Sequence, residues 1–94
     1  MKISEVTREI IKDHCGISDN DSDGLLDVYR EAAVLQISGY TGLSREALDD
    51  HPDLAYALLA IIGEMFSTRD MRVEYDKLNP MAKQIMDLHT VNLL

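Results

Sequence analysis

Cysteine, tryptophan and phenylalanine are scarce in this 94-residue chain, which has one Cys, no Trp and one Phe. The single Cys15 cannot form an intrachain disulfide, which fits a reducing cytosol. With so few aromatic residues, aliphatic and Met side chains must build the core. The N-terminal stretch MKISEVTREI also lacks the uninterrupted apolar region of a signal peptide. We therefore expect the chain to be made and folded in the cytoplasm.

Basic residues are the second shortage. Nine Lys and Arg stand against seventeen Asp and Glu, so the formal net charge is 9 − 17 = −8. A protein that grips nucleic acid by its phosphates needs a basic face, and no Lys/Arg cluster is visible in the sequence. This charge balance argues against a nucleic-acid-binding protein.

Motifs of catalysis and metal binding are also missing. The three histidines, His14, His51 and His89, are far apart and show neither HxxxH nor HExxH spacing. Cys15 follows His14 directly, and neighbouring residues of a helix point about 100° apart, so the two do not form a catalytic dyad. No GxSxG or Gly-rich phosphate loop is present. We expect no catalytic, cofactor-binding or metal-binding residues and no enzyme activity.

One partial motif is the acidic link at residues 18–24, in which Asp19–Gly24 matches the first half of a calcium-binding EF-hand loop. Position 12 of that loop should be a bidentate Glu, but here it is Arg30, and Glu31 comes one residue late. The simpler interpretation is that the Asp and Ser residues cap the N-terminus of the next helix.

What the chain does have is one strongly apolar stretch, Leu54 to Phe66, with no charge from Leu54 to Gly63. A helix that is apolar nearly all round is buried on all sides or lies in a membrane. This run is about half of the roughly 20 residues that a membrane span requires. With Pro52 at the first helical position, the pattern predicts a central helix over residues 52–71 of a small bundle.

Four further helices are predicted around it. Ser4 or Thr7 caps the first, which runs to about Cys15 and ends at Gly16, with Ile17 as an apolar plug. The second spans residues 22–39, is mostly buried, and is broken by Gly39-Tyr40-Thr41-Gly42. Its expected apolar face comprises Leu26, Tyr29, Ala33, Ile37 and Tyr40, widened by Leu25, Val28, Ala32 and Leu35.

Ser44 caps a short third helix, and Asn79-Pro80 opens the last one at about residues 80–89. Residues 72–79 are charged and without a clear period, so we expect a mobile loop. No strand-like alternation or repeat is present. The fold class is therefore all-α: a bundle of four to five helices around the central helix, as a single domain over residues 1–94.

Methionines concentrate in the last third of the chain, where they can fill gaps in the core or form an adaptable protein-binding surface. Arg69, at the end of the apolar helix, can stabilise the helix dipole or anchor an ion pair between subunits. The candidate oligomer or partner contacts are Arg69, Met71, Met81 and Met86.

Several of these features occur in a distinctive order. An SEVT helix start precedes an acidic link, Leu25-Leu26, Ala33, the Gly39–Gly42 break, a Pro-led apolar helix ending in MFSTRD, and Asn79-Pro80. In this order and spacing the chain resembles the head–tail connector (adaptor) family of tailed bacteriophages, also described as DNA-packaging proteins. It is most similar to the small prophage type of Gram-positive bacteria.

The resemblance implies an all-helical structural subunit of the virion, at the head–tail junction. Such subunits form a ring that docks under the portal protein, extends the DNA channel after packaging and receives a tail-side connector or stopper protein. DNA passes through without sequence-specific binding, and no membrane is involved. The family has no catalytic residues; Tyr40, Thr41, Gly42 and Arg69 match its recognisable positions as fold or ring-packing residues.

Two other classes stay open. One is a small helical prophage interaction or regulatory module that binds a protein partner through its Met-rich face. The other is a Ca²⁺-responsive protein built on the acidic link, against which Arg30 counts heavily.

Overall fold

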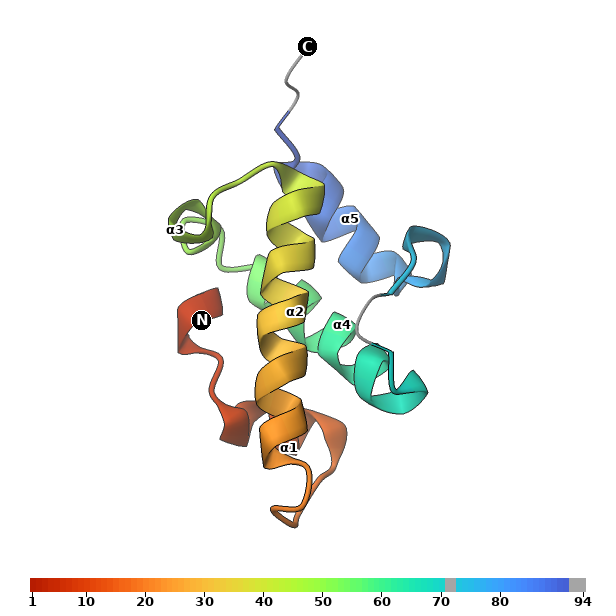
Figure 1. Cartoon of the computed structure of the whole chain (residues 1–94). Coiled ribbons are helices and arrows are strands. Elements are labelled where there is room, and N and C mark those ends of the chain that lie inside the picture. The colour runs from red at the N-terminus through yellow and green to blue at the C-terminus, as the bar shows by residue number, and fades with distance from the viewer. Residues whose placement is uncertain (71–72, 92–94) are drawn as a thin grey trace.

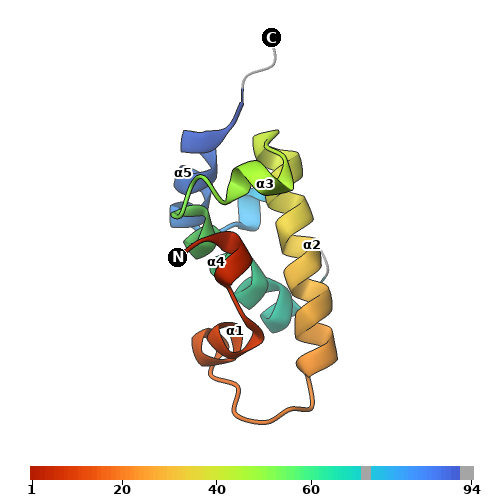
Figure 2. The ribbon, with the colours of Figure 1, turned by 90° about the vertical axis from the view of Figure 1, so that its left-hand side faces the viewer.

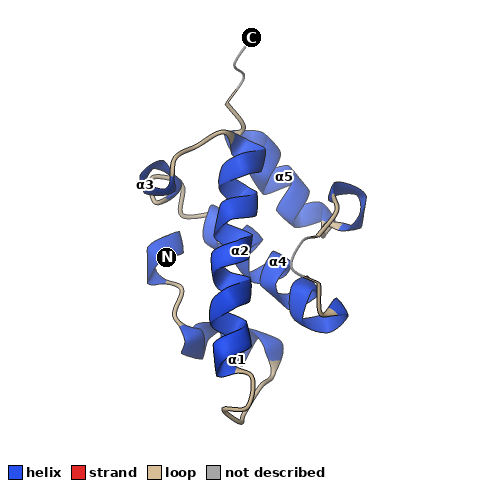
Figure 3. Ribbon diagram, viewed as in Figure 1, coloured by secondary structure: helices blue, strands red, loops and turns tan. Residues whose placement is uncertain are grey.

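The computed structural model describes residues 1–70 and 73–91. Within them the chain forms five α-helices, two short 3-10 helices and no strand, which confirms the all-α prediction (Figures 1 and 3). In chain order the elements are η1 (Ile3–Glu5), α1 (Arg8–Cys15), α2 (Asp23–Thr41), α3 (Arg45–Leu48), α4 (Leu54–Thr68), η2 (Tyr75–Lys77) and α5 (Pro80–His89).

Helix α4 is the central helix, as predicted: it packs against α1, α2 and α5. Leu58 and Ile62 on α4 are completely buried. The helix is shorter than the predicted 52–71, because a turn at residues 51–53 precedes it and Arg69 ends it. Arg69 has a positive φ of 61°, the left-handed conformation that commonly terminates a helix.

Local capping explains how α1 begins and ends. The Thr7 hydroxyl accepts a hydrogen bond from the Ile10 backbone N–H, so Thr7 rather than Ser4 is the cap. Gly16 takes a left-handed φ of 71°, and the Ile17 N–H then donates to the Lys12 carbonyl at 2.9 Å. Ile17 packs against the core as the predicted plug.

Helix α2 runs two residues past its predicted end. The residue in the left-handed conformation is Gly42, with φ 78°, and not Gly39. The buried Thr41 anchors this end: its hydroxyl donates to the Ile37 carbonyl, and its own carbonyl accepts from the Val91 N–H at 2.7 Å. The predicted break at residues 39–42 is therefore a helix end at Thr41, fastened to the segment after α5.

The expectation that α2 is mostly buried is correct for only one side of the helix. The expected inner residues Leu26, Tyr29, Ala33 and Ile37 are buried, but Val28 is 46% and Leu35 is 56% exposed. Figure 2 shows the reason: α2 forms one side of the molecule, and α4 and α5 pack on its inner face only.

The connection between α4 and α5 is tied to α2. The Gln36 side chain holds the backbone of Val73 from both sides, donating to its carbonyl at 2.7 Å and accepting from its N–H at 3.2 Å. Val73 and Leu78 are buried in the core. The predicted start of α5 is confirmed, since the Asn79 side chain accepts from the Met81 N–H and Pro80 is the first helical residue. Mobility of residues 72–79 stays a prediction.

Candidate assembly surfaces

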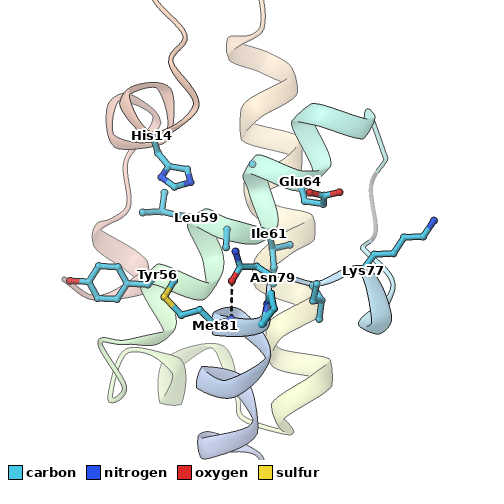
Figure 4. A pocket seen from close by; sticks show the side chains of 12 residues that line it. His14, Tyr56, Leu59, Ile61, Glu64, Lys77, Asn79 and Met81 are labelled. Atoms are coloured by element: carbon cyan, nitrogen blue, oxygen red, sulfur yellow. Dashed lines mark hydrogen bonds between the residues drawn. The ribbon is translucent and has the colours of Figure 1, made fainter.

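A groove of about 680 Å³ lies where the end of α1, the middle of α4 and the start of α5 meet (Figure 4). Its apolar lining includes the side chains of Leu59 from α4 and Met81 from α5. Its rim is mixed in chemistry, since the lining residues include His14, Tyr56, Glu64 and Lys77.

Two side chains of this groove are unusually exposed for their size. Tyr56 is 55% and Met81 is 52% exposed, although both carry large apolar surfaces. Figure 4 shows both near one end of the groove, whereas Lys77 lies at the other end with its ammonium group directed outward. Within the described part of the chain, Lys77 forms no ion pair. The groove thus combines apolar surface with one unpaired cation.

A second apolar surface is the outer face of α2, which we define as Gly24, Val28, Leu35 and Gly39. The spacings of four, seven and four residues place all four on one side of the helix, and all are exposed. A Cβ atom built on Gly24 or Gly39 would meet no other part of the described chain within 4 Å. Val28 and Leu35 are thus the protruding apolar side chains of the outer face of α2, and the exposed Glu31, three residues after Val28 and four before Leu35, lies beside them.

One carboxylate of the acidic link, that of Asp23, is paired with cations of α1. Lys12 binds the Asn20 side chain at 2.7 Å and Asp23 at 3.0 Å, and Arg8 binds Asp23 and Asp27. The hydrogen bond from Arg8 lowers the pKa of Asp27, followed by the Coulombic attraction of the same guanidinium. The link thus joins α1 to α2 by ion pairs.

Capping, the role expected of the link's Asp and Ser residues, is only partly correct. Asp23 does lie in the first turn of α2, but Ser22 at the N-cap makes no side-chain capping bond. No group of three or more His, Cys, Asp or Glu suited to a metal ion occurs among residues 1–70 and 73–91.

Two histidines that are 38 positions apart in the sequence meet at one end of α5. The His51 and His89 rings stack at 4.1 Å, and His89 Nε2 lies 2.8 Å from both carboxylate oxygens of Asp53. This cluster fixes the end of α5 to the turn before α4. His14 lies apart from it, in the groove. Sequence reasoning missed the cluster because no spacing pattern links these residues.

The predicted contact residues have different surroundings. Arg69 is exposed, and its guanidinium lies 4.3 Å from the centre of the Phe66 ring. Met81 lines the groove, as a surface contact requires. Met86 is completely buried, because it faces the core from α5, so in this fold it has no surface to offer a partner. Met71 lies outside the described residues.

Sequence reasoning also missed exposed apolar residues, namely Val28, Leu35, Tyr56 and Leu88. For α2 the signal was present: its apolar residues cover more of the circumference than one buried face needs. For Tyr56 there was no signal, since it lies inside the apolar run of α4.

Comparison with known families identifies the family of this chain. Residues 7–88 match the family model described as phage gp6-like head-tail connector protein, which covers nearly the whole chain. No curated protein and no solved structure matches the chain significantly. None of the helices in the described part of the chain is both long and apolar enough to span a membrane. The matched residues include α1 to α4 and nearly all of α5, so the chain belongs to the phage gp6-like head-tail connector family, whose role in phage assembly is structural.

Proposed function

We propose that this protein forms a ring that docks under the portal protein at the head–tail junction and extends the DNA channel after packaging. The observation that carries the proposal is the family match over residues 7–88. On its tail side the ring receives a further connector or stopper protein. Assembly takes place in the host bacterial cytoplasm, and the product is part of the virion.

The charge of the chain supports a channel through which DNA passes without being bound. At −8 per subunit, a ring concentrates negative charge, and a negative wall repels phosphates. The same charge opposes ring closure, because each added subunit repels the others. Apolar contacts between subunits, or the portal as a template, must compensate.

This balance sets an expectation for the isolated protein. At low salt it should be monomeric or weakly associated, since the Debye length is then long and repulsion between subunits is little screened. Light scattering over a range of salt concentrations measures this directly. A closed ring that is equally stable at low and high salt would contradict the proposed balance.

Electron microscopy of the protein mixed with its cognate portal tests the connector role itself. We expect an added ring of density on the tail-side face of the portal, with portal alone as the control. If no ring appears under any salt condition in which both proteins stay folded, the connector proposal is wrong.

A further inference from the structure

We infer that neighbouring copies of this chain join head to tail, with the outer face of α2 in one copy seated in the groove of the next. The inference rests on the ring proposed above and assigns its subunit interface. It concerns two surfaces that no other part of the described chain covers: the face of Gly24, Val28, Leu35 and Gly39, and the groove lined by Leu59 and Met81.

The positions of the two surfaces fit this arrangement. In Figure 2, α2 lies along one side of the molecule, whereas α1, α4 and α5, which build the groove, lie toward the other. Figure 4 views the groove with α2 behind α4, and Figure 1 views α2 in front of α4. Two different contact surfaces on opposite sides of one subunit produce a head-to-tail assembly, which closes into a ring if the rotation permits.

The shapes of the two surfaces are complementary. An amphipathic helix laid in an apolar groove is a recurrent mode of protein recognition, with anchors at helical spacing. Val28 and Leu35 lie seven residues apart, two turns along one face, and supply such anchors. Gly24 and Gly39 flank them with open space above, so another backbone can approach closely. No atom of the described residues lies within 4 Å of a Cβ placed on either glycine.

Charge favours a second copy as the occupant. The groove carries Lys77, which has no ion-pair partner within the described residues. Asp21, just before α2, forms no ion pair within the described residues, whereas Asp27 and Glu31 along one flank of the outer face are already paired with Arg8 and Arg45. Asp21 of one copy docking near Lys77 of the next lowers a small part of the repulsion that the net charge of −8 imposes.

Sedimentation equilibrium tests this pairing with two single variants and their mixture. Leu35→Glu disables the α2 face and leaves the groove intact, and Met81→Glu does the reverse. At high salt, where repulsion is screened, we expect wild-type association to strengthen with concentration and each variant alone to associate roughly tenfold or more weakly. An equimolar mixture should form a one-to-one complex that grows no further, because only one intact α2 face and one intact groove can meet.

Leu88→Glu is the matched control. Leu88 is 76% exposed on α5 but does not line the groove, so the same change there should leave self-association at the wild-type level. Circular dichroism of all three variants verifies that they are folded.

Several results would contradict the proposed interface. The inference is overturned if either single variant associates like wild type, if the mixture stays monomeric, or if wild type is monomeric even at millimolar protein in high salt. If Leu35→Glu self-associates normally but no longer binds the portal, the face contacts the portal and the inference is again wrong. If both variants form the same ring on the portal as the wild type, the proposed interface is wrong and the connector role is retained. If the wild type itself forms no ring on the portal, the connector role is wrong.

Discussion

Helices α2 and α4 look alike in the sequence, because both carry apolar residues around much of their circumference. In the structure they have different surroundings. Three helices surround α4, whose Leu54, Leu58 and Ile62 are completely buried. Helix α2 is covered on one side only, and Leu35 on its other side is 56% exposed. An apolar helix in a chain this short can therefore be enclosed in the core or leave part of its apolar surface exposed.

The difference between the two helices follows from the size of the chain. A chain of 94 residues has a high ratio of surface to volume, which limits how many of its helices can be surrounded completely. The enclosed helix is α4, which contacts α1, α2 and α5. The apolar residues on the outside of α2 exceed what the core can take up, and a structural protein in an assembly can use them.

The largest effect should come from placing a charge in α4. Leu58→Asp puts a carboxylate at a position with no exposure, and the free energy of unfolding should fall by more than about 4 kcal/mol, enough to unfold a small domain. Leu35→Asp is the matched change on the outer face of α2 and should leave the protein folded. Thermal unfolding followed by circular dichroism compares the two. A folded Leu58→Asp protein would show that α4 is not the central helix.

The same contrast exists within α5, between two methionines that the sequence treats alike. Met86→Ala removes a completely buried side chain and should cost about 2–5 kcal/mol in the free energy of unfolding. Met81→Ala changes a half-exposed side chain and should shift stability by less than about 0.5 kcal/mol, while weakening assembly. Urea unfolding measures both. Equal stability losses would mean that the groove end of α5 is packed as tightly as its core side.

Much of the fold could be predicted from local patterns, since the residues that begin and end a helix act on the backbone next to them. Gly16, Ser44 and Asn79 each occupy the helix boundary predicted for them, and Thr7 is the one of the two predicted caps, Ser4 or Thr7, that the structure uses. The end of α2 was misplaced because Gly39 and Gly42 look equivalent in the sequence. Only tertiary contacts, with Val91 bonded to the Thr41 carbonyl, fix the turn at Gly42.

The surfaces were harder to predict than the fold. Met81 was identified as a contact candidate, but Met86, five residues later, could not be distinguished from it by composition. The groove exists because α1, α4 and the start of α5 converge, and periodicity within a single helix contains no information on which helices meet. The cluster of His51, Asp53 and His89 is invisible in the sequence for the same reason.

Glycine on the outer face of α2 offers a smaller test. Gly39→Ala should raise the free energy of unfolding by roughly 0.5–1 kcal/mol, because Ala favours the helix and the added Cβ meets open space. It should also weaken self-association by crowding the proposed contact. Gly42→Ala, three residues later, should destabilise instead, since φ there is 78°. Differential scanning calorimetry measures the sign of the stability change in both variants. If Gly39→Ala does not change stability, the space above Gly39 is not open to an added Cβ atom.

The smallest effect should come from the ion pairs along the polar flanks of α2. Arg8 lowers the pKa of Asp27 below its ordinary value of 3.8, and Arg45 lowers that of Glu31. Between the folded and the unfolded pKa the unfolded chain binds more protons, so stability rises with pH in that window and is lost as the pH falls through the lowered pKa. In Asp27→Asn, the urea concentration at half-unfolding should therefore fall less steeply as the pH is lowered than in the wild type. The difference should be larger at low salt. Asp13→Asn, an exposed change on α1, is the control; if it reduces this pH dependence equally, the Arg8–Asp27 pair contributes nothing specific, and any electrostatic link between α1 and α2 rests on Asp23.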